Sequence, residues 1–290
     1  MRCEFVEAER ARHEVGRLCV NLRMARSTYY GWKTRLPSER TIENIRLRRE
    51  MRLIHAESDR TYGSPRMRLE LQHRGYPTIS LSRVMRLMRA EKLVAKPVRR
   101  KPRYRVERGV MPAAPNLVAQ EFSVGAVNKV WASDITYLWT SRGWVYLAVV
   151  LDLGSRRVIG WMTMASLSCN LVLEALRRAL AARPPSGGLI HHSDRGSQFN
   201  SNEFQMALSR HGVQCSMSGK GNCYDNAVVE AFFSTLKRER TSDRRYATRE
   251  DAERDLFEYI EVFYNRRRRH TSLGGVSPVE FERRLLEQSA

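Results

Sequence analysis

From residue 129 onwards the chain alternates apolar and polar residues as β-strands do. This alternation limits the possible folds more than any other feature of the sequence. Three β-rich runs follow one another: KVWASDITYLWTS (129–141), GWVYLAVVLDLGS (143–155) and RRVIGWMTMAS (156–166). Short turns join them, which predicts an antiparallel meander. Helix and strand patterns then alternate to about residue 240. This order predicts a mixed α/β sheet covered by helices on both faces.

Helical patterns dominate the part before residue 95. They cover 43–57, a stretch that starts at Pro65, and 80–91. Gly75 suits a helix stop and Ser80 a helix cap, so the last two helices would flank a tight turn. On the second of them Arg83, Arg86 and Arg89 recur every three residues. This pattern fits a helix-turn-helix that grips DNA.

An earlier stretch, EVGRLCVNLRMARSTYYGWKTR (14–35), has the same form. An apolar helix precedes a short turn, and Ser27 is expected to cap an aromatic and basic helix. The alternative for both stretches is a helical bundle whose arginines face solvent. Between the two halves, residues 95–118 hold four prolines and dense arginine, which predicts an extended basic linker.

Charge points to the partner. The chain of 290 residues has 51 Lys and Arg against 31 Asp and Glu, a net charge of +20. Most of the excess lies in residues 1–110, with 28 basic and 12 acidic side chains. Positive charge gains affinity for nucleic acid by releasing counterions from phosphates. The sequence therefore predicts an anionic polymer, first of all DNA, as the partner.

Cysteine usage and hydropathy concern the compartment. The five cysteines form no C-x-x-C pair, so neither a disulfide framework nor a zinc knuckle is indicated. No apolar run approaches the ~20 residues that a membrane span needs, and the charged N-terminus does not resemble a signal peptide. A cytoplasmic protein is expected.

Three carboxylates stand where a fold alone would not favour them. Asp134 lies in the middle of a strand run, on the face of Ala132 by alternation. Asp194 ends the buried strand pattern LIHHSD, at the sheet edge where ligands gather in α/β folds. Glu230 lies one turn into an apolar helix. Each has an ordinary alternative role. Asp134 would face water on an edge strand, Asp194 would start a turn, and Glu230 would complement the helix dipole.

Together, these three carboxylates form an oxygen-rich ligand set without Cys or His. Such a set suits Mg²⁺ or Mn²⁺ rather than zinc. Carboxylates that hold two ions about 3.5–4 Å apart stabilise the attacking and leaving oxygens of phosphoryl transfer. A basic protein with this site is expected to cut or join nucleic-acid backbones.

The spacing and the surrounding words resemble a known family. Asp134 and Asp194 have 59 residues between them, and Asp194 and Glu230 have 35. The words S-D-I-T-Y, H-S-D-R-G-S-Q-F and D-N-A-V-V-E-A-F-F-S-T-L-K surround them. The chain resembles the OrfB-type DDE transposases of bacterial insertion sequences. The resemblance extends to Y-G-S-P-R at 62–66 and to FYNRRRRHTSLGGVSPVEFE near the C-terminus.

The resemblance implies a ribonuclease H-like integrase core with Asp134, Asp194 and Glu230 as the metal-binding and catalytic triad. It implies two Mg²⁺ ions, with Mn²⁺ as a substitute. Lys237 follows Glu230 by seven residues and returns to nearly the same helix face, so it is expected to meet a phosphate beside the metals. Its alternative is a solvated surface lysine.

Further DNA contacts are expected from two basic groups. Lys220 lies in the loop G-K-G, which resembles the mobile loop before the catalytic helix; its glycines suit hinges better than a phosphate cradle. Arg267, Arg269 and His270 belong to the RRRRH run, for which a helix-end charge cluster is the alternative.

Four other titratable residues are expected to be structural. Asp152 matches no spacing of the triad and is assigned to a turn. His191 and His192 are expected to pack rather than ligate. Asp225 lies roughly 140° around a helix from Glu230, which favours a loop or capping role.

The expected fold class is therefore α/β: a ribonuclease H-like mixed sheet with flanking helices, preceded by an all-α helix-turn-helix region. The expected function is metal-dependent DNA cleavage and strand transfer at the ends of an insertion sequence. The alternatives are a non-catalytic DNA-binding repressor and a ribonuclease H-like nuclease. Expected partners are double-stranded DNA, further copies of the chain, and an upstream-frame product or fusion. The predicted segments are a helix-turn-helix-like part (1–40), a helix-turn-helix domain (41–95), a linker (96–120), the catalytic core (121–240) and a helical extension that completes it (241–290).

Overall fold

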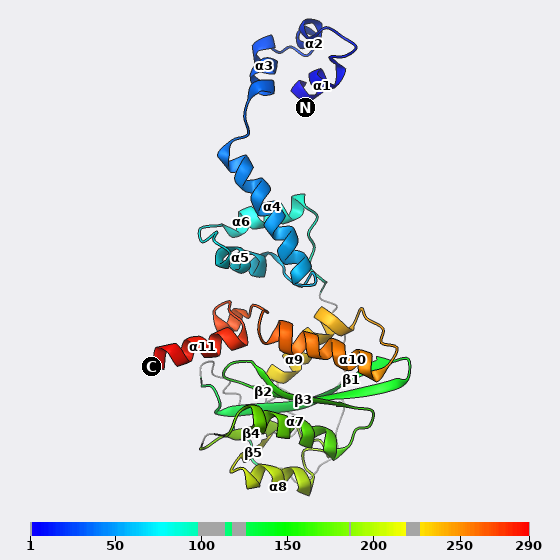
Figure 1. Cartoon of the computed structure of the whole chain (residues 1–290), viewed down its shortest axis with the longest axis vertical. Coiled ribbons are helices and arrows are strands. Elements are labelled where there is room, and N and C mark those ends of the chain that lie inside the picture. The colour runs from blue at the N-terminus through cyan, green and yellow to red at the C-terminus, as the bar shows by residue number, and fades with distance from the viewer. Residues whose placement is uncertain (1, 98–113, 118–125, 186, 219–226, 290) are drawn as a thin grey trace. The chain divides into compact units, whose positions relative to one another are not determined.

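The computed structural model describes residues 2–97, 114–117, 126–185, 187–218 and 227–289 (Figure 1). The chain divides into two compact units, Met1–Arg52 and Leu53–Ala290. The boundary falls inside the long helix α4 (Glu39–Glu57). Each unit has its own fold.

The first unit is helical. Its core consists of Val6, Leu18, Cys19 and Tyr29, and the Tyr29 hydroxyl donates to the Glu7 carboxylate. Before α4 it comprises α1 (Arg2–Glu9), α2 (Val15–Asn21) and α3 (Arg26–Thr34).

The expected cap of α3 is wrong by two residues. Ala25, not Ser27, is the N-cap, with an extended backbone (φ −72°, ψ 143°) and no side-chain hydrogen bond. The Thr28 N–H donates to the Ala25 carbonyl (3.1 Å), so the helix already includes Ser27. The first turn forms without a side-chain cap, and a serine at its second position was a misleading signal.

In the second unit the end of α4 is followed by the predicted pair of short helices, α5 (Ser64–His73) and α6 (Leu81–Ala90). Gly75, just past α5, has φ +98°, which glycine adopts without strain. Ser80 caps α6, because its hydroxyl accepts from the Arg83 N–H (3.3 Å). The stop and the cap read from the sequence are confirmed.

A five-stranded sheet with the order β3-β2-β1-β4-β5 follows. The first three strands form the predicted antiparallel meander, and β4 and β5 add in parallel beside β1. The sheet is therefore mixed, as expected. Its strands are β1 (Val130–Thr140), β2 (Gly143–Asp152), β3 (Val158–Met164), β4 (Ile190–Ser193) and β5 (Gln214–Met217).

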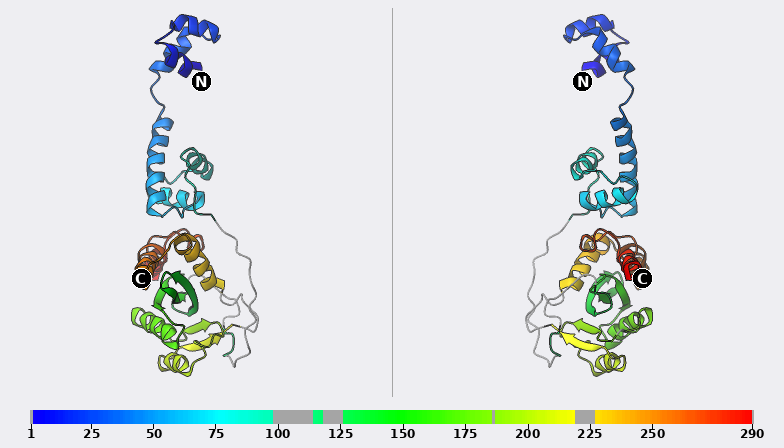
Figure 2. Two further views of the ribbon diagram at one scale, coloured as in Figure 1. Left: turned by 90° about the vertical axis from the view of Figure 1, so that its right-hand side faces the viewer. Right: turned by 90° about the vertical axis from the view of Figure 1, so that its left-hand side faces the viewer.

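Helices cover both faces of the sheet, and the views in Figures 1 and 2 agree on the two layers. One apolar core joins one sheet face to α7 (Cys169–Ala182) and α8 (Asn202–Arg210). A second core joins the other face to α9 (Ala227–Leu236), α10 (Arg249–Phe257) and the π-helical turn η3 (Glu258–Tyr264). Fold-class expectations for this half are confirmed.

The C-terminal half of the second core was less predictable. The apolar helix that contains Glu230 is α-helical only to Leu236 and continues as a π-helical turn, η2 (Lys237–Thr241). A short 3-10 turn, η4 (Thr271–Leu273), and α11 (Pro278–Ser289) complete the chain.

A single glycine sets how closely α7 approaches the sheet. A Cβ on Gly160 of β3 would lie 2.3 Å from the Ala175 carbonyl oxygen and 2.7 Å from the Ala179 nitrogen, both backbone atoms of α7. Gly160→Ala should therefore push the helix from the sheet and destabilise the fold by roughly 1–3 kcal/mol. Chemical denaturation measures this loss. Gly31→Ala, in helix α3 with nothing within 4 Å of its added Cβ, should not destabilise.

Candidate active site

Asp134 lies in β1 where the strand loses one neighbour. The parallel pairing of β1 with β4 ends at Ser133 and Ser193, whereas the pairing with β2 continues to Thr140. The Asp134 carboxylate is half-buried, and its Oδ1 accepts from the Ile135 N–H (2.8 Å). The aspartate thus occupies the point at which the centre of the sheet opens.

Asp194 directly follows the last residue of β4. Ser193 pairs with Ser133, so Asp194 and Asp134 each lie one residue beyond the last pair of the two strands. Adjacent strands lie about 4.8 Å apart. Its Oδ1 accepts from the Gly196 N–H (2.9 Å) in the turn that follows. Asp134, in the middle of β1, and Asp194, just past the end of β4, therefore lie on neighbouring parallel strands at the point where their pairing ends.

Glu230 belongs to the first turn of α9 and is exposed. The neighbouring Val229, Phe232 and Phe233 are buried in the core that also contains Ala132 of β1. By alternation Ala132 and Asp134 share a sheet face. Helix α9 thus covers the face on which Asp134 lies, which brings the third carboxylate to the same side of the sheet.

Among the residues that the structure describes, no group of three or more His, Cys, Asp or Glu side chains is close enough to hold a metal ion. The structure therefore brings Asp134 and Asp194 together, and places Glu230 on the covering helix without completing a three-ligand site. Two aspartates on neighbouring strands nevertheless have the oxygen chemistry that Mg²⁺ or Mn²⁺ requires. These residues fit a divalent ion.

Lys237 is the first residue of η2. Its ammonium lies over the Tyr137 ring, 5.1 Å from the centroid. Tyr137 is three residues beyond Asp134 on β1. A cation therefore borders the strand that contains the first aspartate.

Three other titratable residues have the structural roles expected of them. Asp152 is fully buried and accepts from the N–H groups of Asn128, Gly154 and Ser155, while Arg183 forms an ion pair with it (2.6 Å). Burial raises the pKa of Asp152, against the opposing pull of these partners.

Both histidines of β4 are buried. His191 Nε2 lies 2.7 Å from the Ser133 hydroxyl, and His192 Nδ1 lies 2.9 Å from that of Ser216. Burial lowers the pKa of His191 to about 3, with a smaller effect from the charge of His192, so its ring is neutral. The expected packing role is confirmed.

The basic residues expected to touch DNA differ in exposure. On α6, Arg86 and Arg89 are exposed and Arg83 is half-buried. Lys220, its flanking glycines Gly219 and Gly221, and Asp225 lie outside the described residues.

The RRRRH run divides between solvent and interior. Arg267 is exposed, but Arg269 forms an ion pair with Glu70 of α5 (2.8 Å). His270 is buried edge-on against Tyr264, with ring centroids 4.8 Å apart. Burial, followed by the charge of Arg268, lowers the pKa of His270. Arg269 and His270 therefore make contacts within the folded chain.

A buried carboxylate that sequence reasoning missed connects α9 to two distant segments. Glu239 of η2 is 2% exposed. Arg268 holds both of its oxygens at 2.8 Å, and Arg66 of α5 donates to Oε1 (3.0 Å). The Tyr259 hydroxyl donates to Oε2 (2.9 Å). Glu239 lies within the charged segment KRER, which looks like an exposed helix end. Only the spacing of the apolar residues around it indicates that this position is buried.

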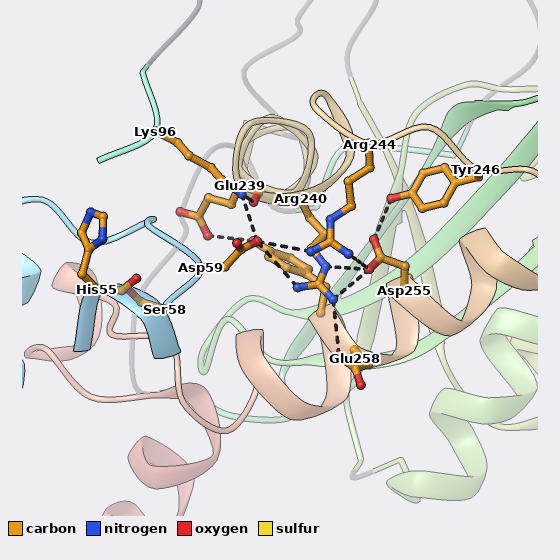
Figure 3. Close-up of polar contacts among 11 residues, drawn as sticks. His55, Ser58, Asp59, Lys96, Glu239, Arg240, Arg244, Tyr246, Asp255 and Glu258 are labelled. Carbon is orange, nitrogen blue, oxygen red and sulfur yellow. Dashed lines mark hydrogen bonds and ion pairs between the residues drawn. The ribbon is translucent and has the colours of Figure 1, made fainter. Parts of the chain in front are cut away.

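A second ionic cluster lies beside it (Figure 3). Asp59, just after α4, accepts from Lys96 (3.0 Å) and pairs with Arg240 and Arg244. Both arginines also contact Asp255 of α10, and the Lys96 ammonium donates to the Glu239 carbonyl (2.7 Å). Ion pairs and a hydrogen bond therefore connect the helix-turn-helix segment to the turn after α9.

Family models match almost the whole chain after the first unit's three short helices. An HTH-like domain matches residues 42–102, and two integrase core domain models match residues 125–223 and 230–286.

No helix among the described residues is long and apolar enough to cross a membrane.

Curated relatives match over their full length. The insertion element IS600 uncharacterized 31 kDa protein of Shigella sonnei is 38% identical over 273 residues, which are 94% of this chain and 100% of that protein. Transposase InsF for insertion sequence IS3A of Escherichia coli (strain K12) is 40% identical over 288 residues, 99% of this chain and 100% of that protein.

Solved structures give a more distant likeness. The catalytic core domain of BIV integrase has a TM-score of 0.41 at 18% identity, and covers 56% of this chain and 98% of that chain. The catalytic core domain of HTLV-2 integrase in complex with magnesium, in its trimeric form, has a TM-score of 0.40 at 16% identity, and covers 53% and 95%.

An integrase core behind an HTH-like domain defines the class: a DDE polynucleotidyl transferase of the transposase type. With relatives 38–40% identical over their whole length, the chain belongs to the family of insertion-sequence transposases that includes InsF. The resemblance read from the sequence is confirmed.

Proposed function

We propose that this transposase cuts and joins DNA strands at the ends of its own insertion sequence, with Asp134, Asp194 and Glu230 as its catalytic carboxylates. One observation carries the proposal: Asp134 and Asp194 each lie one residue beyond the last pair of the parallel strands β1 and β4, and α9, with Glu230 in its first turn, covers the sheet face of Asp134.

The three carboxylates would hold two Mg²⁺ ions, for which Mn²⁺ can substitute. When bound, such ions activate the attacking oxygen and stabilise the leaving one. Strands β1 and β4 fix the two aspartates, so little reorganisation accompanies binding. Lys237, beside the same strand, would attract a phosphate toward them.

The helix-turn-helix segment (41–95) would grip double-stranded DNA. Arg86 and Arg89 face solvent on the capped helix α6, Arg83 lies on the same helix, and Arg267 is exposed on the C-terminal run. Lys220 would add a contact from the loop before α9. Phosphate contacts of this kind position a protein without reading sequence.

The salt dependence of DNA binding tests this grip. The double variant Arg86→Gln/Arg89→Gln should weaken binding to all duplexes alike, and should reduce the slope of log K against log salt by roughly one per lost phosphate contact. Fluorescence anisotropy at several salt concentrations measures the slope. Arg177→Gln, an exposed arginine of α7, is the matched control and should leave the slope unchanged.

Assembly is part of the proposal. Two element ends must be handled together, so we propose that copies of the chain multimerise on DNA, and that an upstream-frame product or fusion contributes to end recognition. DNA binding would place the protein on the bacterial nucleoid.

Labelled DNA ends from either side of the reading frame test the proposed activity. With Mg²⁺ or Mn²⁺, the wild-type chain should cut and join these ends, and should not process a shuffled sequence. EDTA should abolish the products. Binding without any cutting would favour the repressor, and preference for an RNA–DNA hybrid would favour a ribonuclease H-like nuclease.

A further inference from the structure

Three aromatic side chains gather in solvent at the β1–β2 hairpin. Tyr137, Trp139 and Trp144 are 56%, 59% and 48% exposed. Trp144 lies edge-on to both of the others, with ring centroids 5.0 Å from Tyr137 and 4.8 Å from Trp139. Trp139 and Trp144 are direct cross-strand partners. We call these three residues the aromatic cluster.

The cluster lies on the sheet face that α7 and α8 cover, but beyond the part that these helices cover. On the same face Ile135 and Tyr146 still pack against the core under α7 and α8. The three aromatic residues one step further along the hairpin have no such cover. A contiguous group of exposed aromatic side chains is typical of a binding site.

The hairpin is held rigidly. Its Ser141 N–H donates to the Tyr246 carbonyl (2.9 Å), and Thr140 forms a bridge with Tyr246. Within the turn the Thr140 hydroxyl donates to the Gly143 carbonyl (2.8 Å). The rings are therefore presented in a fixed arrangement, which limits the entropy lost when a ligand binds.

Charge and position select the ligand. Tyr137 lies three residues beyond Asp134 on one strand, about 10 Å at ~3.3 Å per residue, and by alternation on the opposite sheet face, in the part of β1 that no longer pairs with β4. The Lys237 ammonium lies over the same ring. A ligand that offers flat π-faces together with a negative backbone matches this pairing, and single-stranded nucleic acid is such a ligand. A base-paired duplex hides its base faces and would not fit.

We propose that the aromatic cluster stacks unpaired bases of the DNA strand that leads to the catalytic carboxylates. This inference rests on the proposed function, because it takes DNA at this sheet edge as the substrate. The cluster would hold open the last base pairs beside the scissile phosphate and prefer frayed or single-stranded ends.

Equilibrium binding of the full chain tests the cluster without catalysis. Without metal, the chain is titrated into a labelled blunt element-end duplex and into the same duplex carrying a short unpaired flank, and the fluorescence anisotropy of the DNA label is recorded. Trp139→Ala and Trp144→Ala should each weaken binding of the unpaired flank by roughly 5- to 150-fold, the range of one lost stacking contact. Blunt duplex binding should change little.

Two controls accompany these variants. Trp139→Phe keeps a ring and should retain most of the affinity, and Phe257→Ala removes an exposed aromatic ring from α10, outside the cluster. An unchanged thermal midpoint shows that the variants fold.

Alanine variants that bind the unpaired flank as tightly as the wild type would overturn the proposal. So would variants that only convert a multimer into monomers, as sedimentation would show, because the cluster would then be an interface between copies. If the alanine variants lose flank binding but the wild-type chain never cuts DNA, the role of the cluster would be supported and only the proposed activity would be refuted.

Discussion

Asp134→Asn is expected to lower the rate of DNA strand cleavage by at least about 100-fold, since even partners one step removed from a metal change activity by about 10- to 100-fold. The substitution keeps the size of the side chain and removes the charge that a divalent ion needs. The rate is measured as single-turnover cleavage of labelled element ends.

Asp194→Asn should have a similar effect, and the double variant should be little slower than either single one. Residues that act as a unit lose activity together rather than additively. Asp243→Asn, an exposed aspartate after η2, should cleave at the wild-type rate. Full activity in either triad variant, with normal folding, would remove that aspartate from the site.

Glu239→Gln should destabilise the second unit by roughly 3–5 kcal/mol, because it leaves Arg268 buried without its charged partner. Four of the five tryptophans lie in this unit, so their fluorescence during chemical denaturation follows its unfolding. Glu280→Gln removes a carboxylate paired with Arg283 and Arg284 near the surface and should cost about 1 kcal/mol or less. Equal losses in the two variants would contradict a special role for Glu239.

The same carboxylate makes stability depend on pH. Burial alone would raise the pKa of Glu239, but hydrogen bonds and charge from Arg268, and then the charge of Arg66, lower it to about 2 from 4.5. Its contribution is therefore complete above about pH 4.5 and is lost as the pH falls toward 2. Denaturation at pH 6 and pH 3 should show this loss in the wild type and a much smaller one in Glu239→Gln.

Local patterns were sufficient for most of the fold. The alternation in β1 and β2, the glycine at 75 and the serine at 80 each express a rule that acts over a few residues, and the structure follows them. Ser27 failed because a helix can begin without a side-chain cap.

Long-range contacts escaped prediction. Glu239 meets Arg66 across 173 residues and Arg268 across 29, and nothing in the word KRER indicates that its glutamate is buried. The same holds for Arg269 and His270, which sit in a run typical of DNA contacts but face Glu70 and Tyr264. The distinctive words around Asp134, Asp194 and Glu230 made them candidates for the site, whereas ionic partners depend on tertiary packing.

Glu230 offers the most direct test of the catalytic site, because it lies on α9 rather than on the strands that bring the two aspartates together. The measurement is cleavage and joining of labelled element ends with Mg²⁺ or Mn²⁺ by the wild type and by Glu230→Gln, with DNA binding recorded in parallel. We predict metal-dependent products from the wild type, and unchanged binding without products from the variant. Products from Glu230→Gln at the wild-type rate would contradict the assignment of Asp134, Asp194 and Glu230 as one catalytic site.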